Sequence, residues 1–246
     1  MHIYLYDATF EGLLTAIFYS FSDKGELDIQ RAADFQPTLL SAPLSITTEE
    51  DKARRVAHSI QERLSWQTWK RVYYLYLSEL PGCEYLIYRY LKLCYQAGDA
   101  INLSKDHPII HQVERTCYKV TYEAHRFKGF VRFSELAPKV FYSKIEPDHN
   151  ILPLLAHHFS KRFSDQKFMI HDLTRQYALV YDLKQVYFHD LTPAEAQRLS
   201  AQRPDDPYQE LFAIFFDATN IPERYNPRLQ RYWMPKRYWK HIDEAH

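Results

Sequence analysis

The chain has 246 residues, with 31 Lys and Arg side chains against 31 Asp and Glu side chains, so its net charge is zero at pH 7. This length allows one large domain or two small ones. Hydrophobic residues make up 46% and charged residues 25%, which is typical of a globular chain and excludes a disordered one. The neutral balance points to no polyanionic partner, so nucleic-acid binding would depend on local charge clusters.

Cysteine usage and hydropathy bear on the compartment. The three cysteines, Cys83, Cys94 and Cys117, are widely spaced and odd in number, so they do not form a disulfide framework. The first residues lack the pattern of a signal peptide, and no stretch reaches the ~18 apolar residues of a membrane helix. We therefore expect a cytoplasmic protein without a membrane segment.

The N-terminal part of the chain alternates a short strand with helices. Residues 3–6 are apolar and aromatic, which favours a strand, and Asp7 or Thr9 can cap the helix that follows. Residues 34–45 contain two prolines and are expected to form a loop. The next helix is the clearest in the chain, because apolar residues at helical spacing follow a capping box formed by Thr47 and Glu50.

Three further helices precede a change of pattern. Residues 67–97 predict two antiparallel helices separated at Pro81 and Gly82, and residues 109–126 predict another. Polar turn-forming residues lie between residue 97 and residue 109 and suggest a domain boundary there. We therefore expect a helix-rich N-terminal region with a short first strand over residues 1–105, and an α+β region with basic and aromatic segments over residues 106–246.

The second region is rich in short β-prone runs. They are interrupted by a helix expected at residues 151–163, and further helices are expected from Pro193 and at residues 208–218. Because brief turns separate most of these runs, we expect one mainly antiparallel sheet with flanking helices, and hence an α+β fold. The predicted strands are residues 130–133, 140–142, 168–171, 178–181 and 186–188.

Several common catalytic motifs are absent from the sequence. The five glycines are too far apart for a dinucleotide fingerprint or a phosphate-binding loop. The cysteines do not have the spacing of a zinc or iron–sulfur site, and neither HExxH nor GxSxG occurs. We therefore expect no cofactor and no metal site, and exclude dehydrogenases, P-loop enzymes, radical-SAM catalysts and α/β hydrolases.

Two segments combine basic and aromatic residues. Residues 115–144 hold seven Lys or Arg and two Glu, and residues 224–242 hold six Lys or Arg and no acidic residue. Cations beside rings suit nucleic acid, because phosphates are held electrostatically while bases stack on aromatic faces. The alternative is a core strand and a tail whose charged ends merely reach solvent. The candidate nucleic-acid-binding residues are Arg126, Lys128, Arg132, Arg228, Arg231, Trp233, Lys236, Arg237, Trp239 and Lys240.

A third set of residues is polar and could be catalytic. Asp148 and His149 precede the helix at residues 151–163, while His171 and Asp172 end a β-prone run. Carboxylates and imidazoles at such positions can act as general acid and base or as metal ligands. The alternative is that they cap a helix and form a turn, which is the commoner role of polar residues at element ends.

Five blocks of the sequence carry a resemblance to a known family. They are YDATFEGLLTAIF, HRFKGFVRF, EPDHNILPLLAHHFSKRF, IHDLTRQYALVYD and MPKRYW. Together they resemble a bacterial family described as probable DNA metabolism proteins. The resemblance implies companionship with a radical-SAM protein of DNA modification or repair, and related chains are joined to a uracil-DNA glycosylase-like domain. Where that family has glycine after the first aspartate, this chain has Ala8.

These observations give one leading hypothesis and two alternatives. The leading one is an accessory protein of DNA repair or modification that binds DNA, preferably single-stranded, and works with a radical-SAM partner. One alternative is an enzyme acting on a nucleobase or nucleotide through Asp148, His149, His171 and Asp172. The other is a protein-interaction subunit whose exposed rings meet another chain.

Overall fold

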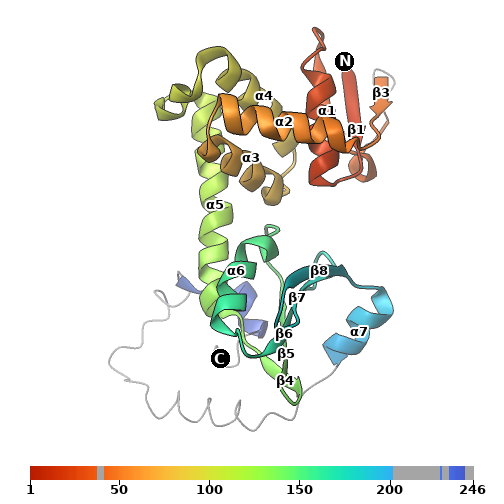
Figure 1. Cartoon of the computed structure of the whole chain (residues 1–246), viewed down its shortest axis with the longest axis vertical. Helices are drawn as coiled ribbons and strands as arrows, with labels where there is room; N and C mark the ends of the chain where they lie inside the picture. The colour runs from red at the N-terminus through yellow and green to blue at the C-terminus, as the bar shows by residue number, and fades with distance from the viewer. Residues whose placement is uncertain (38–41, 202–227, 229–232, 242–246) are drawn as a thin grey trace. The chain divides into compact units, whose positions relative to one another are not determined.

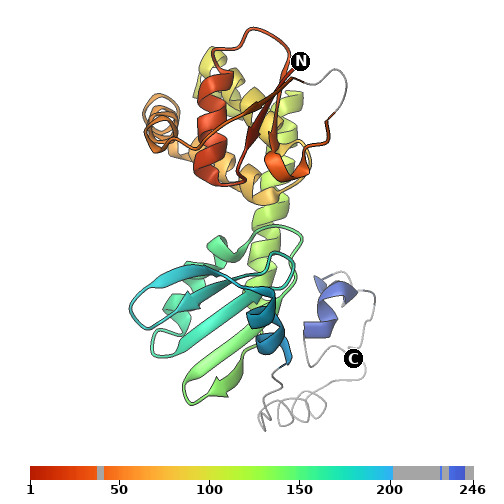
Figure 2. The same ribbon diagram turned by 90° about the vertical axis from the view of Figure 1, so that its right-hand side faces the viewer.

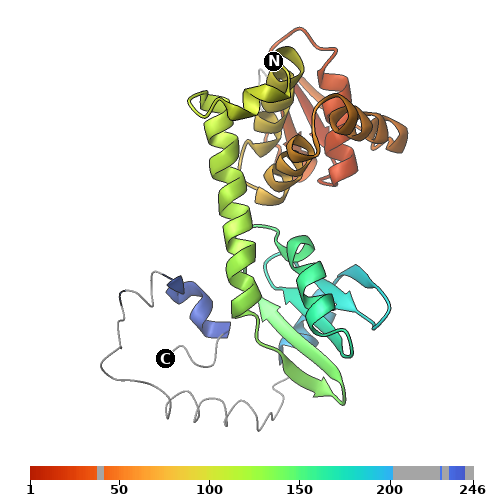
Figure 3. The ribbon, with the colours of Figure 1, turned by 60° about the vertical axis from the view of Figure 1, so that its left-hand side comes forward.

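The computed structural model describes residues 1–37, 42–201, 228 and 233–241, and the fold is α+β as expected. The chain divides into two compact units, Met1–Thr121 and Tyr122–His246. The boundary between them falls inside α5 (Pro108–Phe130), which Figures 1 and 3 show as one continuous helix. The division expected near residue 105 stays a prediction.

The first unit contains a three-stranded parallel sheet (Figure 2). Strand β1 (His2–Tyr6) is central, and β2 (Leu27–Arg31) and β3 (Ala42–Ser45) flank it in parallel. The sequence predicted only the first of these strands, and the expectation of loop throughout residues 34–45 was wrong. The reason is that β3 is an exposed edge strand containing Pro43, so it lacks the apolar alternation by which strands are recognised.

Four helices and the start of α5 complete the first unit. Each expected helix is present, but Thr47 does not cap its helix, because the N-cap residue is Glu49 and makes no side-chain cap bond. Fully buried aliphatic side chains such as Leu13, Ile60 and Leu91 join the helices to the sheet in one core. The helices are α1 (Phe10–Ser20), α2 (Glu50–Arg63), α3 (Trp66–Ser78) and α4 (Cys83–Ala97), with short 3-10 helices η1 (Ala32–Asp34) and η2 (Asp99–Leu103).

The second unit is built on a five-stranded sheet of order β4-β5-β6-β7-β8. Three of its four pairings are antiparallel, which confirms the expected mainly antiparallel sheet. The exception is β5 with β6, which run parallel because helix α6 (Leu152–Arg162) connects them. The strands are β4 (Ser134–Ala137), β5 (Val140–Ile145), β6 (Lys167–Asp172), β7 (Tyr177–Tyr181) and β8 (Val186–Asp190).

The strand expected at residues 130–133 was wrong. Helix α5 continues to Phe130, beyond the end expected at residue 126, and the first strand of the second unit is β4. In the helix, Phe127 and Phe130 lie three residues apart on one face, and both rings contact Tyr238 at centroid distances of 4.9 and 5.8 Å. Tertiary packing thus overrides the β propensity of this run.

Helices cover both faces of this sheet (Figure 2). On one face, Phe159 of α6 packs against Phe168 of β6, and Phe133 contacts both rings edge to face. On the other, Ala196 of α7 (Pro193–Ala201) packs with Ala178 of β7. The helix expected at residues 208–218 lies outside the described residues. Within the described part of the chain, no helix is long and apolar enough to cross a membrane.

Gly12, in the first turn of α1, provides a direct test of close packing at the end of β1. A Cβ atom there would lie 2.1 Å from Asp7 Oδ1 and 2.8 Å from Thr48 Oγ1. We expect Gly12→Ala to lower the free energy of unfolding by about 1–3 kcal/mol, as overpacking does, although alanine favours helix. Gly129→Ala in α5 is the control, since nothing lies within 4 Å of its Cβ. Chemical denaturation should show the control unchanged or stabilised, and equal effects of the two variants would contradict the packing argument.

Candidate nucleic-acid interface

The polar residues predicted as a catalytic set lie at the ends of two adjacent strands. Strands β5 and β6 are parallel and Ile145 pairs with Asp172, so their carboxyl ends lie at the same edge of the sheet. The loop that carries Asp148 and His149 therefore comes next to the turn that follows Asp172. This topology brings three of the four predicted residues to one region of the second unit.

Arg175 binds this loop to this turn. Its guanidinium donates to Asp172 Oδ2 at 2.9 Å and to the carbonyl oxygens of Pro147 and Asp148 at 3.2 and 3.1 Å. The Asp172 side chain is completely buried, and its other oxygen accepts the backbone N–H groups of Thr174 and Arg175. Burial raises the pKa of the Asp172 carboxyl, and the ion pair with Arg175 opposes that shift. Asp172 therefore holds the turn together.

Glu123 of α5 joins the same loop to residues 233–241, which we call the C-terminal segment and which include the 3-10 helix η4 (Lys236–His241). It is 6% exposed, and its two carboxylate oxygens accept the backbone N–H groups of Asp148 and His149, each at 2.9 Å. Tyr238 donates its hydroxyl to Glu123 Oε1 at 2.7 Å. One buried carboxylate thus holds three parts of the second unit, and the sequence analysis did not single it out.

His171 lies apart from the other three predicted residues. Successive strand residues point to opposite faces of a sheet, so the side chains of His171 and Asp172 project to different sides. His171 is fully buried, and its Nδ1 lies 2.9 Å from the hydroxyl oxygen of Tyr142 on β5. Burial lowers the pKa of His171, which favours the neutral ring. Across the described ranges, no group of three or more His, Cys, Asp or Glu side chains could hold a metal ion.

Three arginines of the predicted nucleic-acid-binding set are bonded within the protein. Arg126 donates to the carbonyl oxygen of Trp233, and Arg132 donates to the carbonyl oxygen of Gly129 at 2.7 Å. Arg237 lies 2.5 Å from Asp148 and donates to Tyr238. These bonds fix the end of α5 and the C-terminal segment.

Other residues of that set lie at the surface. Arg228 and Lys236 are exposed, and the Trp233 side chain is 55% exposed. Trp239 is half-buried, and its Nε1 donates to the carbonyl oxygen of Met234 at 2.8 Å. Arg231 lies outside the described residues, as does the side chain of Lys240. Both tryptophan rings thus belong to a segment that is bonded to the rest of the unit.

Lys128, the remaining member, lines a cationic pocket that the sequence analysis missed. The pocket has a volume of about 360 Å³ and lies between α5 and α6, and we call it the α5–α6 pocket. Lys161 and Arg162 are exposed at its edge, and no carboxylate is among the residues that line it. Its lining residues are Lys128, Leu154, His157, His158, Lys161 and Arg162.

The spacing of residues on α6 produces this cluster. His157 and Lys161 are four residues apart, as are His158 and Arg162, so the pairs form adjacent rows on the helix. The pKa of His158 is lowered by burial and by the positive charges of Lys128 and Arg162. That spacing, visible in the run HHFSKR, was the signal available in the sequence.

The fold and this pocket define an α+β protein with a cation-lined site that suits an anionic ligand. Residues 81–244 match DUF4130, a domain of unknown function, and the chain belongs to that family. The match begins in the turn before α4, so it includes the whole α5–α6 pocket and omits the three-stranded sheet. No curated protein matches the chain.

The role of Glu123 can be measured by exchange for its amide. We expect Glu123→Gln to lower the free energy of unfolding by about 1–3 kcal/mol, because an amide nitrogen would face a backbone N–H and leave a buried donor without an acceptor. Asp148→Asn is the control: it removes only the half-exposed ion pair with Arg237, worth about 0–1 kcal/mol. Chemical denaturation of both variants measures the difference, and a milder effect at Glu123 than at Asp148 would refute the assignment.

Burial of His171 predicts a dependence of stability on pH. Its folded-state pKa is lowered, so its contribution to stability is complete above the unfolded-state value of about 6.5 and is lost as the pH falls below it. We expect His171→Gln to show a smaller loss of stability between pH 7 and pH 5 than the parent. The free energy of unfolding, measured by denaturation at several pH values in this range, tests the prediction. An equal loss of stability in the parent and in His171→Gln would be evidence against it.

Proposed function

We propose that the protein binds the phosphate backbone of nucleic acid and acts as an accessory protein in DNA repair or modification. The observation that carries this proposal is the α5–α6 pocket, where Lys128, Lys161 and Arg162 meet two histidines without a carboxylate. Phosphate binding by such cations releases counterions, which supplies affinity that is independent of sequence and falls steeply with salt.

A simpler explanation covers only part of this cluster. Lys161 and Arg162 lie in the last turn of α6, where cations stabilise the negative end of the helix dipole. That effect does not explain why Lys128, from another helix, points to the same pocket, or why His157 and His158 line it too. Like charges gathered from two elements destabilise the free protein, so an anionic ligand is the better explanation.

The context of repair rests on the resemblance and the aromatic segments. The blocks that resemble the DNA metabolism family include both α6 and the C-terminal segment. The resemblance favours a radical-SAM protein as partner, and the 55% exposed Trp233 favours single-stranded DNA, since an exposed ring can stack on an unpaired base.

An enzyme acting on a nucleobase remains an alternative with weaker support. Asp172 and Glu123 hold loops through several hydrogen bonds each, and His171 projects to the other face of the sheet from Asp172. A protein-interaction subunit is the third possibility, and its support is the exposed ring of Trp233.

The test measures binding of a fluorescent single-stranded oligonucleotide at several salt concentrations. We expect Lys128→Ala/Lys161→Ala to weaken binding to different sequences alike. The negative slope of log K against log salt should become less steep by about 1.4, because each phosphate contact on a single strand contributes about 0.7 to its magnitude and two contacts are lost.

Lys24→Ala/Lys105→Ala is the matched control, with the same change of charge at two exposed lysines of the first unit. It should leave the slope unchanged. Absence of binding by the parent protein at low salt, or equal effects of the two double variants, would overturn the proposal. Tighter binding to a duplex than to a single strand would overturn only the proposed preference for single-stranded DNA.

A further inference from the structure

We propose a second ligand site, in the first unit, that takes a nucleotide unit with its base among aromatic rings and its phosphate on an arginine. The site is a pocket of about 560 Å³ lined by α1, α2, α4 and the residues just after α1, and we call it the ring–arginine pocket. Its volume falls in the usual range of ligand pockets, about 300–1,000 Å³. The site is independent of the α5–α6 pocket.

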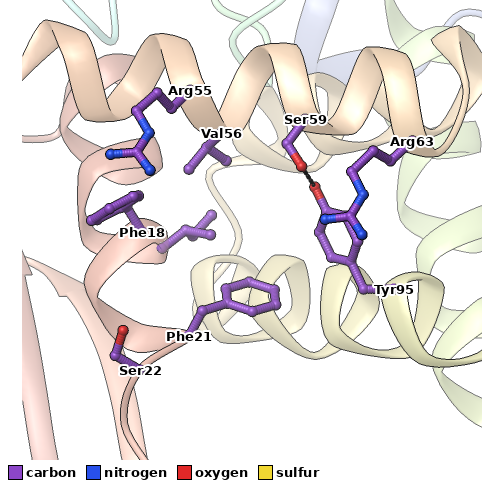
Figure 4. A pocket seen from close by; sticks show the side chains of 9 residues that line it. Phe18, Phe21, Ser22, Arg55, Val56, Ser59, Arg63 and Tyr95 are labelled. Carbon is purple, nitrogen blue, oxygen red and sulfur yellow. Dashed lines mark hydrogen bonds between the residues drawn. The ribbon is translucent and has the colours of Figure 1, made fainter.

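Rings and guanidinium groups surround the open centre of this pocket. Figure 4 shows Phe18, Phe21 and Tyr95 around the centre, with the side chains of Arg55 and Arg63 descending from α2 on either side. The two arginines stand eight residues apart, or about 12 Å along the helix. A ligand that lies along α2 would therefore have one of the two arginines near each of its ends, so that a phosphate at either end could be bound.

Phe21 presents an aromatic surface that the protein leaves uncovered. Its ring is 42% exposed, although edge-to-face contacts with Tyr88 and Tyr95 hold it at centroid distances of 5.7 and 5.6 Å. A fixed and exposed ring at the edge of a cavity is a platform on which a base can stack, which contributes about 1–3 kcal/mol per base.

The two arginines are positioned by rings and not by carboxylates. Arg55 Cζ lies 5.0 Å from the centroid of Phe18, and Arg63 Cζ lies 6.0 Å from that of Tyr95. Neither forms an ion pair with a carboxylate in the described residues, whereas the neighbouring Arg54 pairs with Glu50 and Asp51. Their guanidinium groups therefore keep the donors that bind phosphate in a bidentate manner.

Hydroxyl groups complete the lining. Tyr95 donates its hydroxyl to Ser59 Oγ at 2.9 Å, and Ser22 lies at the opposite side of the pocket (Figure 4). Such groups suit the edge of a base or a sugar hydroxyl. An aliphatic acid would use the arginines but not the rings, and a neutral aromatic compound would use the rings but not the arginines. A nucleotide uses both.

An alternative is that Arg55 and Arg63 only cover apolar surface with their aliphatic stems. In that case the rings beneath would be shielded, but Phe21 is 42% exposed and a cavity of about 560 Å³ remains between the helices. All but one of the lining residues precede residue 81, where the DUF4130 match begins, so the family assignment does not bear on this site.

Calorimetric titration of the full chain with deoxyadenosine monophosphate, deoxyadenosine and inorganic phosphate tests the proposal. We expect the nucleotide to bind at least tenfold more tightly than either fragment. Arg55→Gln/Arg63→Gln should lower the affinity for the nucleotide at least tenfold and leave the affinity for deoxyadenosine nearly unchanged. Phe21→Leu should lower both affinities. Arg54→Gln, at a 72% exposed side chain on the same helix, is the matched control and should change neither affinity.

Two further arms separate the possible outcomes. A trideoxyadenylate that binds at least tenfold more tightly than the mononucleotide identifies a strand as the source of the nucleotide unit, and equal affinities identify a free nucleotide. Lys128→Ala/Lys161→Ala should leave mononucleotide binding intact, which distinguishes this site from the α5–α6 pocket. No binding of nucleotide at millimolar concentration, or unchanged binding in the double arginine variant with its circular dichroism intact, would overturn the proposal.

Discussion

The buried carboxylate of Glu123 is the constraint on which the second unit depends. It accepts two backbone N–H groups from the loop after β5 and the hydroxyl of Tyr238, which lies 115 residues further along the chain. Removal of a charged carboxylate from water is costly unless such donors replace the lost hydration. Because they do, α5, the loop and the C-terminal segment keep one arrangement, and α5 also carries Lys128 into the cationic pocket.

Two groups of cations in the described part of the second unit have different surroundings. Arg126, Arg132 and Arg237 donate to carbonyl oxygens or to a carboxylate of their own unit, where the planar guanidinium can make several directed bonds. Lys128 and Lys161 instead line an open pocket whose lining residues include no carboxylate. Local charge counts along the sequence therefore do not distinguish cations that are bonded within the unit from cations that line a pocket.

Much of the fold could be predicted from the sequence, and much less of the site. Helical periodicity and β-prone runs gave the α+β class, because one apolar face per element is a local property. The prediction of a strand at residues 130–133 was wrong, because contact with Tyr238 holds Phe130 in a helix. The partners of Glu123 lie 25, 26 and 115 residues away, so no local pattern could have revealed them.

Ala8 shows how local conformation can explain a difference from the family that the sequence resembles. Its φ angle is 65°, in the left-handed region that glycine adopts freely and that costs another residue about 1–2 kcal/mol. Asp7 supports the turn by accepting bonds from Thr9 and Thr48, and the carbonyl oxygen of Ala8 accepts the hydroxyl of Tyr76 at 2.9 Å. Glycine at this position is therefore explained by the backbone angle alone, without a ligand that approaches the turn.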